Sequence, residues 1–292
     1  MSDPVISIKG LRKSYGETEA VRGIDLEVNR GEVFAFLGPN GAGKTTTVEI
    51  LEGYRRRSGG EVTVLGEDPE RAGREWREGI GIVLQSGRLD PYLTVRESLD
   101  LYAGYFRSPR PTADVIALVG LEEKADERTG RLSGGQQRRL DVGMALVGDP
   151  ELLFLDEPTT GFDPSARRQA WDVIAGLRDL GKTVFLTTHY MDEAQRLADR
   201  VTIIAAGQIV ARGTPQDLGQ RESGETTIRY RQDGREVVLQ TSNPVQALHE
   251  LTEKALAGGG ALEGLEVTRP SLEDVYLELT AASEAPAEGG RR

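Results

Sequence analysis

A glycine-rich segment between Gly38 and Thr46 constrains the fold of this chain more than any other feature. It follows the apolar run Val33 to Leu37, which predicts a buried strand. The residues after it, Thr46 to Leu51, can continue as a helix. This strand–loop–helix context is the one that the G-x-x-x-x-G-K-[ST] pattern requires, so a phosphate-binding loop is predicted here. Its residues are Gly38, Pro39, Asn40, Gly41, Ala42, Gly43, Lys44, Thr45 and Thr46.

The residue types in this loop suit a bound nucleotide. Glycines let the backbone take positive φ and come close to a ligand. The loop amides and the helix N-terminus then point at an anion. Lys44 supplies a positive charge for the β- and γ-phosphates, and the Thr45 hydroxyl can bind Mg²⁺. A chance match in a glycine-rich turn is the alternative, and the flanking strand and helix argue against it.

Composition narrows the class of protein. The 292 residues suggest about two domains, or one large domain with an appendage. The formal net charge of -11 argues against a nucleic acid as the main partner, and the basic run Arg55 to Arg57 is better interpreted as a solvated surface turn. Cysteine is absent and only His189 and His249 occur, so disulfides and a Cys/His metal site are excluded.

Targeting features are not expected. No apolar run approaches the roughly 18 residues that a membrane span needs. The start, Met1 to Val5, has neither a basic region nor an apolar one of the kind found in signal peptides. We therefore expect a cytosolic protein.

Strand and helix patterns alternate along most of the chain, which predicts an α/β fold with a mostly parallel sheet. Residues of about 88–147 carry helical periodicity and form an insertion between strands. Two turns are expected early in the chain, one at Lys13 to Gly16 and a hairpin turn at Asn29 to Glu32. Residues 221–280 predict a small α+β accessory domain, and the polar tail 281–292 is expected to be disordered.

Candidate catalytic residues follow the predicted strands, where ligands bind in parallel sheets. The apolar run Leu152 to Leu155 ends in two acids that suit phosphoryl transfer. Asp156 is the expected Mg²⁺ ligand, through water, and Glu157 the expected catalytic base. His189 also ends a strand and can donate to a γ-phosphate. Gln85 could contact either Mg²⁺ or the attacking water.

Tyr15 precedes the phosphate loop, so its ring could stack on an adenine. On the residues alone, an ordinary half-buried turn tyrosine is the favoured interpretation.

A five-residue motif identifies a family. The run Leu132 to Gln136 resembles the signature motif of ABC transporter ATPases, and Ser133 with the glycine amides would open a helix that binds phosphate. Its residues are Leu132, Ser133, Gly134, Gly135 and Gln136. The resemblance covers residues of about 4–220. It implies a P-loop NTPase with a RecA-like, mostly parallel sheet core, an antiparallel β subdomain and a helical subdomain.

The resemblance also implies how the nucleotide is held. In this family two ATPase domains meet head to tail, so each ATP lies between one phosphate loop and the other subunit's signature motif. Tyr15 resembles the adenine-stacking residue, Gln85 the Q-loop glutamine and His189 the switch histidine. Gly161-Phe162-Asp163 resembles the D-loop, which puts Asp163 near the partner's site; Phe162 stands where leucine is commoner. Every motif is present, so a homodimer should bind ATP and Mg²⁺ and hydrolyse two ATP.

The C-terminal region suggests a branch of the family. Arg269 to Thr280, and His189 to Gly213, are similar to drug-exporter ATPases of the daunorubicin-resistance type. The resemblance implies an ATPase that powers export of a drug-like or other hydrophobic substrate. It would act from the cytoplasmic face of the membrane through a separate permease, contacted around Gly87 to Glu97. Exporters of lipids, polysaccharides or sodium carry similar tails, and an importer subunit or a ribosome- or DNA-associated ABC ATPase is the alternative.

Overall fold

The computed structural model describes residues 4–84, 89–219, 226–232, 235–257, 262–268 and Tyr276. The chain divides into two compact units, the first reaching Arg212 and the second beginning at Gly213. None of the helices in these described ranges is long and apolar enough to cross a bilayer.

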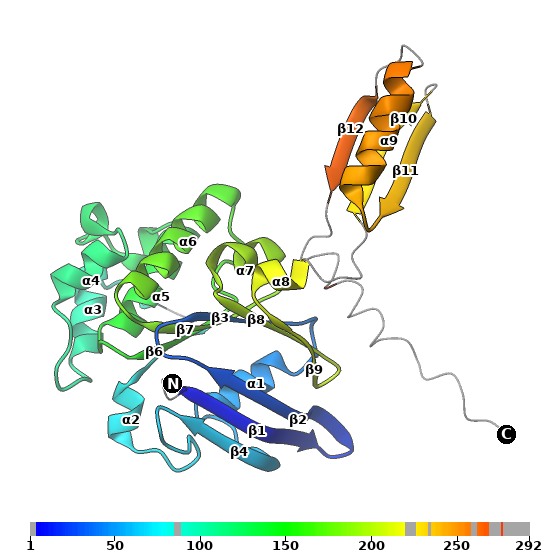
Figure 1. Cartoon of the computed structure of the whole chain (residues 1–292). Helices are drawn as coiled ribbons and strands as arrows, with labels where there is room; N and C mark the ends of the chain where they lie inside the picture. Colours follow the sequence, from blue (N-terminus) through cyan, green and yellow to red (C-terminus); the bar gives the residue numbers. More distant parts are fainter. Residues whose placement is uncertain are drawn as a thin grey trace. The chain divides into compact units, whose positions relative to one another are not determined.

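A six-stranded sheet with the order β5-β6-β7-β3-β8-β9 forms the centre of the first unit (Figure 1). Its strands are β3 (Val33–Leu37), β5 (Ile80–Val83), β6 (Leu152–Asp156), β7 (Thr183–Thr188), β8 (Arg200–Ala205) and β9 (Gln208–Gly213). The pairs β5–β6, β6–β7, β7–β3 and β3–β8 are all parallel. Every residue of β3 and β7 is buried, as expected for central strands covered on both faces. The carboxyl ends of these parallel strands therefore meet along one edge, where the site forms.

Helices cover both faces of this sheet. One face carries the helical group α3 (Val95–Ala103), α4 (Thr112–Leu118), α5 (Gly134–Leu146), α6 (Pro164–Asp179) and α7 (Met191–Leu197). On the other face, α1 (Lys44–Leu51) lies between the central sheet and a second, antiparallel sheet (Figure 1). The predicted helical insertion is thus formed by α3, α4 and α5, whose apolar stripes share one core.

The antiparallel sheet has the order β2-β1-β4, with β1 (Ile6–Tyr15), β2 (Thr18–Val28) and β4 (Gly59–Val64). The predicted turn at Lys13 to Gly16 is wrong in its bounds, because Lys13 to Tyr15 complete β1 and Tyr15 pairs with Thr18. The register shifts between Ile8 and Leu11, so the alternation that marks the first half of the strand does not continue into the second. The short helix α2 (Arg74–Glu78) follows this sheet.

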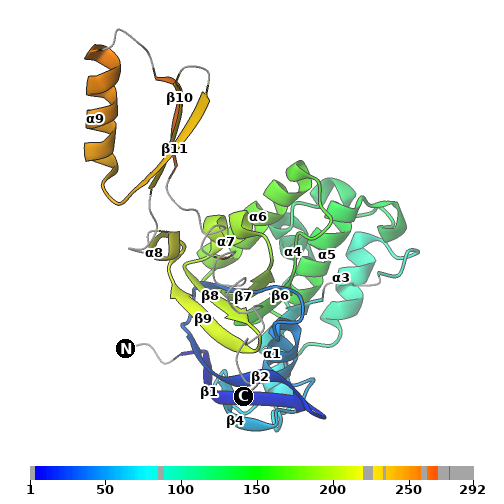
Figure 2. The ribbon, with the colours of Figure 1, turned by 90° about the vertical axis from the view of Figure 1, so that its right-hand side faces the viewer.

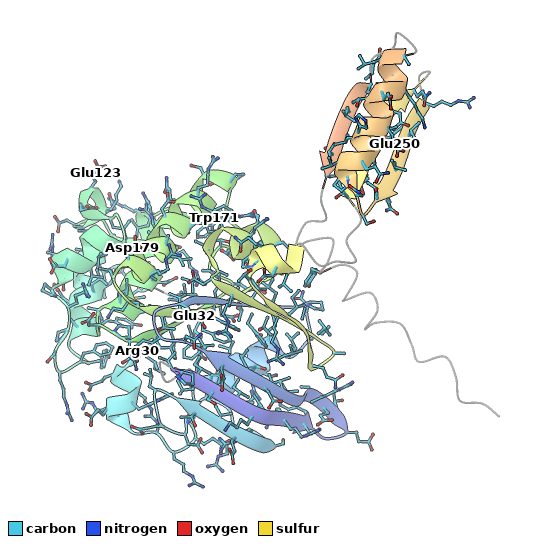
Figure 3. The ribbon with its side chains drawn as sticks, viewed as in Figure 1. Arg30, Glu32, Glu123, Trp171, Asp179 and Glu250 are labelled. Carbon is cyan, nitrogen blue, oxygen red and sulfur yellow. The ribbon has the colours of Figure 1, made fainter. Side chains whose placement is uncertain are left out.

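The hairpin predicted at Asn29 to Glu32 is also wrong, because β2 and β3 belong to different sheets. Glu32, labelled in Figure 3, stabilises this connection. Its carboxylate accepts a hydrogen bond of 2.7 Å from the Asn29 amide and lies 3.3 Å from the Arg200 guanidinium. A hairpin within one sheet and a connection between two sheets can both appear in the sequence as a buried strand joined to an exposed strand by a short polar turn. The sequence pattern alone therefore could not distinguish these two arrangements.

The second unit contains a three-stranded antiparallel sheet and a helix (Figure 2). Its elements are α8 (Pro215–Gly219), β10 (Thr226–Gln232), β11 (Arg235–Thr241), α9 (Pro244–Ala257) and β12 (Glu263–Thr268). Helix α9 lies along one face of the sheet, and β10 supplies the buried Ile228 and Tyr230. β10 and β11 pair in antiparallel register, from Thr226 opposite Thr241 to Gln232 opposite Arg235. The C-terminal motif, apart from Tyr276, and the tail from Ala281 lie outside the described residues.

Candidate nucleotide-binding and hydrolysis site

The phosphate loop connects β3 to α1, as its sequence context predicts. At Gly43 the backbone has a φ of 104°, and a Cβ there would lie 2.6 Å from the Ala20 carbonyl oxygen. At Gly38 a Cβ would collide with the Ile204 carbonyl. Both positions therefore require glycine, one for its conformation and both for space. The loop is fixed by neighbouring strands before any ligand binds.

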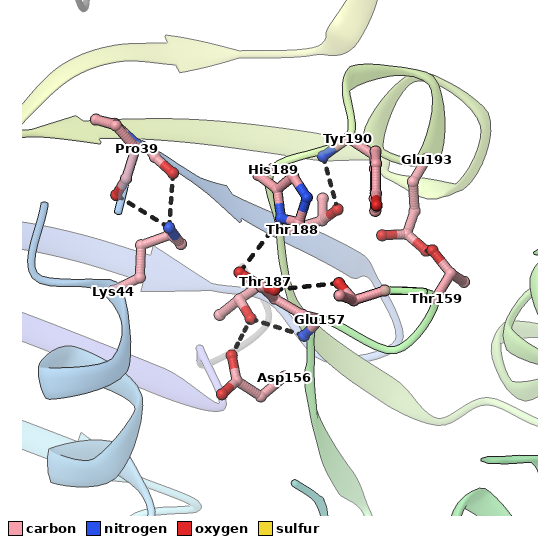
Figure 4. Close-up of polar contacts among 12 residues, drawn as sticks. Pro39, Lys44, Asp156, Glu157, Thr159, Thr187, Thr188, His189, Tyr190 and Glu193 are labelled. Atoms are coloured by element: carbon pink, nitrogen blue, oxygen red, sulfur yellow. Dashed lines mark hydrogen bonds and ion pairs between the residues drawn. The ribbon is translucent and has the colours of Figure 1, made fainter. Parts of the chain in front are cut away.

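Lys44 begins α1 and is buried, with only 6% of its surface exposed. Its ammonium donates hydrogen bonds to the Gly38 carbonyl at 2.6 Å and the Pro39 carbonyl at 3.1 Å (Figure 4). Burial lowers the pKa of Lys44, while the charges of Glu157 and Asp156 raise it. An anion near this lysine would favour the charged form, which is the condition for binding phosphate.

The loop borders a cavity of about 640 Å³. The lining residues come from β2, the phosphate loop and the ends of β6 and β7, and they are Ala20, Asn40, Gly41, Gly43, Lys44, Thr45, Thr46, Glu157, Thr160 and His189. Segments more than 100 residues apart in the sequence thus meet at one polar cavity. Its size suits a ligand of small-molecule dimensions.

Asp156 and Glu157 lie at the end of β6, and Thr187 of β7 forms hydrogen bonds with both residues. The Thr187 hydroxyl donates to the Asp156 carboxylate, and the Glu157 amide donates to that hydroxyl at 3.1 Å and to the Thr187 carbonyl at 3.0 Å. The backbone of Glu157 has a φ of 46°, an unfavourable conformation for a non-glycine residue. Such strain is found preferentially at functional sites, and here it turns the Glu157 side chain into the cavity.

The Glu157 carboxylate has two further partners. The Thr160 hydroxyl donates to one oxygen at 3.1 Å, and His189 Nδ1 lies 3.3 Å from the other (Figure 4). His189 also packs against Tyr190, with ring centroids 4.1 Å apart and the ring planes tilted by 38°. The carboxylate and the imidazole therefore face the same cavity from two neighbouring strands.

Arg138 of α5 is a functional residue that sequence reasoning missed. Its guanidinium donates to the Leu84 carbonyl, to the Asp156 carbonyl at 2.9 Å and to the Pro158 carbonyl at 3.1 Å. It is 8% exposed, so these bonds fix the ends of β5 and β6 on either side of Glu157. A signal was present in the sequence: Arg138 lies four and seven residues before Val142 and Ala145, on the buried stripe of its helix.

A second missed cluster lies behind His189. Glu193 of α7 is fully buried, and its carboxylate accepts hydrogen bonds from the Thr159 hydroxyl at 2.8 Å and from the Trp171 indole at 3.2 Å (Figure 3 labels Trp171). Burial raises the pKa of Glu193, and these hydrogen bonds oppose that effect. The cluster joins α6, α7 and the segment after Glu157.

The signature residues form a helix N-terminus. Ser133 caps α5: the Gln136 amide donates to its hydroxyl at 3.3 Å, and the Ser133 amide donates to the Gln136 side chain at 2.9 Å. Asp163 likewise caps α6, accepting from the Ser165 and Ala166 amides at 2.8 and 2.9 Å. Among the described residues that line the cavity, none comes from 132–136 or is Asp163.

Tyr15 and Gln85 are the two other residues that the sequence predicts at the site. Tyr15 is 42% exposed, its hydroxyl lies 3.5 Å from the Thr46 hydroxyl, and the Lys13 ammonium lies 5.0 Å from its ring centroid. Its ring thus lies close to the phosphate loop with part of its surface open to solvent. Gln85 lies outside the described residues.

The site has oxygen donors that suit Mg²⁺. Thr45 lines the cavity, and Asp156 ends the strand that carries Glu157. Within the described part of the chain no cluster of three or more acidic, histidine or cysteine side chains could enclose a metal alone. Mg²⁺ commonly binds through one or two protein oxygens plus substrate phosphates and water, so the available groups fit that mode.

Comparison with known proteins identifies the family. Residues 21–160 match the model of the ABC transporter family. Over its length the chain is similar to the Nod factor export ATP-binding protein I of Rhizobium sp., at 39% identity with 96% of this chain and 98% of the relative covered. The chain belongs to the ATP-binding subunits of ABC transporters.

Solved structures share the fold. The cbiO1 protein from Clostridium perfringens, part of the ABC transporter complex cbiONQ, matches with a TM-score of 0.69 and 28% identity, covering 76% of this chain and 92% of that chain. The dimeric ATP-binding cassette MJ0796 bound to ADP and Pi matches with a TM-score of 0.63 and 26% identity, covering 72% of this chain and 98% of that chain. The predicted P-loop fold is therefore confirmed, and the chain is an ATPase of a family whose members couple hydrolysis to transport.

Proposed function

We propose that this chain hydrolyses ATP to power export of a hydrophobic, drug-like substrate through a separate membrane permease. The observation that carries the proposal is the similarity over 96% of the chain to a protein named as an export ATP-binding protein. That similarity favours export over import. An exporter of lipids, polysaccharides or ions is the second candidate, because the C-terminal resemblance extends to such proteins.

We assign the nucleotide to the cavity beside Lys44. The loop amides and the Lys44 ammonium would bind the β- and γ-phosphates, and Tyr15 would stack on the adenine. Lys44 would exchange its hydrogen bonds to Gly38 and Pro39 for phosphate oxygens. Bound Mg²⁺, held by Thr45, Asp156 and Gln85, would neutralise charge on those phosphates.

Hydrolysis is assigned to two side chains that face the cavity. Glu157 would accept a proton from the attacking water, and His189 would donate a hydrogen bond to the γ-phosphate. Their separation of 3.3 Å allows His189 to orient Glu157 as well. The strained backbone at Glu157 and its hydrogen bond from Thr160 limit the rotation of the carboxylate.

Two copies would complete each site. The capped N-terminus of α5 at Ser133 is not part of the described lining of its own chain's cavity, and its helix amides could bind the γ-phosphate of a partner's ATP. Asp163, on the loop after Glu157, would lie near that same contact. The dimer of MJ0796 with ADP and Pi supports a two-subunit arrangement. We propose a head-to-tail homodimer on the cytoplasmic face of the membrane, bound there through the permease.

Glu157→Gln tests this function. The variant keeps the shape of the side chain but removes the base, so ATP binding should persist while turnover falls by at least about a hundredfold. The measurements are nucleotide affinity and steady-state phosphate release. The matched control is Glu123→Gln, an exposed residue between α4 and α5 (Figure 3), which should leave both unchanged. Near-native turnover in Glu157→Gln would contradict the assigned base.

The transport assignment needs a separate readout. Tagged Glu157→Gln chain, trapped with ATP and solubilised in mild detergent from its native host, should retain an integral membrane protein with several spans. Reconstituting that protein with the wild-type chain in vesicles should give ATP-dependent movement of a fluorescent hydrophobic substrate. Recovery of ribosomes or DNA-bound proteins instead of a permease would contradict the transport function.

A further inference from the structure

The two side chains assigned to hydrolysis come from different strands. Glu157 follows β6 and His189 follows β7. The β6–β7 register ends at Asp156 opposite Thr187, so the segments that continue after Glu157 and after His189 have both left the sheet. Contacts outside the sheet are therefore needed to keep the Glu157 carboxylate 3.3 Å from the His189 ring.

Glu193 makes a contact between these two segments. It lies in the first turn of α7, four residues after His189, and is fully buried. Its carboxylate accepts a hydrogen bond of 2.8 Å from the hydroxyl of Thr159, which lies two residues after Glu157 and is also fully buried. Figure 4 shows Glu193 and Thr159 together, on the far side of Glu157 and His189 from Lys44. One hydrogen bond thus joins the segment after β6 to the helix after β7.

The residue next to Thr159 contacts the Glu157 carboxylate. Thr160 donates a hydrogen bond of 3.1 Å from its hydroxyl to that carboxylate. Thr159 is buried whereas Thr160 is exposed, so the two neighbouring side chains point to different sides of one segment. Holding Thr159 on the buried side therefore holds the backbone from which Thr160 reaches Glu157.

The same oxygen of Glu193 has a second donor. The Trp171 indole of α6 donates to it at 3.2 Å. No residue of α6 belongs to the described lining of the nucleotide cavity, and neither do Glu193 and Thr159. The two hydrogen bonds share one acceptor, but only the bond from Thr159 comes from the segment that carries Glu157 and Thr160.

A carboxyl group at this position has a cost that packing alone would avoid. Burial raises the pKa of Glu193, and hydrogen bonds from the side chains of Thr188, Thr159 and Trp171 lower it. An apolar side chain of similar volume would fill the same space without that cost. A buried acceptor with several donors is instead held in one orientation, because each lost hydrogen bond would leave a polar group unsatisfied.

We infer that Glu193 is a positioning residue for hydrolysis, which keeps the Glu157 carboxylate in place beside His189 by holding Thr159. This inference rests on the proposed function, because it takes Glu157 as the base and His189 as the donor to the γ-phosphate. Glu193 supplies a hydrogen-bond acceptor at a fixed point, so glutamine can replace it and an apolar side chain cannot. Without the bond, Thr160 and Glu157 would move relative to His189, which slows the chemical step without weakening ATP binding.

Three variants of the full chain test this role by steady-state phosphate release, which gives kcat and the KM for ATP. Glu193→Met and Thr159→Val should each lower kcat about tenfold. Each should leave KM within about twofold, because neither residue lines the nucleotide cavity. Glu193→Gln keeps an acceptor in a side chain of the same shape, so its kcat should stay within about threefold of wild type.

Trp171→Phe is the matched control. It removes the other donor to the same oxygen and keeps an aromatic ring in place. Its melting temperature should fall at least as far as that of Thr159→Val, by about 2–5 °C, while its kcat stays within about twofold of wild type. A chain that combines Glu193→Met with Thr159→Val should have the kcat of Glu193→Met alone, because both changes remove one bond.

Glu157→Gln separates failure of this inference from failure of the proposed function. The inference is overturned, and the proposed function stands, if Glu157→Gln abolishes turnover while Glu193→Met and Thr159→Val keep the wild-type kcat. Equal losses of kcat in Thr159→Val and Trp171→Phe would also overturn it, since Glu193 would then be purely structural. Near-native turnover in Glu157→Gln would defeat the proposed function and this inference together. If Glu193→Met does not fold, the comparison of Thr159→Val with Trp171→Phe decides the inference.

Discussion

Glu52 shows how one buried residue links pH to stability. Its folded-state pKa of about 8 exceeds the ordinary value of 4.5 because burial penalises the charged form, with the charges of Asp156 and Glu49 adding to the effect. Between these two pH values the folded chain holds a proton that the unfolded chain releases. The free energy of unfolding therefore falls as pH rises through this window.

Glu52→Gln should reduce this pH dependence. Glutamine has nearly the same shape and carries no charge, so the variant should match wild type near pH 5 and exceed it in unfolding free energy by about 2 kcal/mol at pH 9. That magnitude is below the value expected from the full pKa shift, because Glu52 lines a cavity of about 610 Å³ through which solvent reaches its carboxyl group. Urea unfolding at both pH values measures it. A difference between the two proteins that is the same at pH 5 and pH 9 would contradict the assignment, and Glu123→Gln should show no pH-dependent difference.

Among the elements, the ends of β5 and β6 are held by a helix in addition to their pairing with each other. The Arg138 guanidinium of α5 binds carbonyls that follow or end both strands, on either side of Glu157. Backbone pairing in a parallel sheet stops at the strand ends, so these carbonyls would otherwise be left without a donor. The signature helix thus contributes directly to the geometry of its own subunit's catalytic carboxylate.

Arg138→Met should damage both stability and turnover. Methionine fills similar space but leaves the three carbonyls unpaired, which should cost about 2–4 kcal/mol of unfolding free energy and lower kcat about tenfold. Calorimetry and phosphate release measure the two effects.

The matched control is Arg139→Met. The Arg139 guanidinium also binds two carbonyls, those of Val119 and Gly120, but away from the site. The Arg139→Met variant should therefore have a lower free energy of unfolding than wild type but an unchanged kcat. Equal kcat values for the two variants would show that Arg138 has no role in positioning Glu157.

The sequence predicted the elements whose pattern is local. The phosphate loop and the strand that ends at Asp156 were both found with bounds within two residues. The short helix α2 was missed because five residues give too little periodicity. Arg138 and Glu193 were missed for another reason: their roles depend on carbonyls and side chains distant in the sequence, which no local pattern encodes. The placement of Gln85 stays a prediction.

At the scale of the whole molecule, the two units have separate sheets. The central sheet is complete by Gly213, the last residue of β9, and its buried core residues precede that point. The second unit pairs β10 with β11 and β12 and has its own buried residue at Ile228. The predicted boundary between an ATPase domain of residues 4–220 and an accessory domain of 221–280 stays a prediction.

A chain ending at Gly219 tests that boundary. It retains every strand of the central sheet and every described residue of the nucleotide cavity. We expect it to fold with a melting temperature within about 5 °C of the full chain and to hydrolyse ATP within about threefold. The measurements are calorimetry and phosphate release at matched protein concentrations. Aggregation on expression, or a molten state by near-ultraviolet circular dichroism, would show that the ATPase unit depends on the remainder.

The position of Lys44 has a consequence for how a nucleotide is loaded. Its ammonium is bonded to the Gly38 and Pro39 carbonyls, so the loop supplies oxygen acceptors to its own cation. Loading is then an exchange reaction, in which phosphate oxygens replace carbonyl oxygens around one ammonium. The cation is never left without acceptors during that exchange, so affinity reflects the difference between two similar sets of bonds and not the full strength of either. After hydrolysis the Gly38 and Pro39 carbonyl oxygens can replace the product's phosphate oxygens around the Lys44 ammonium, which makes product release easier.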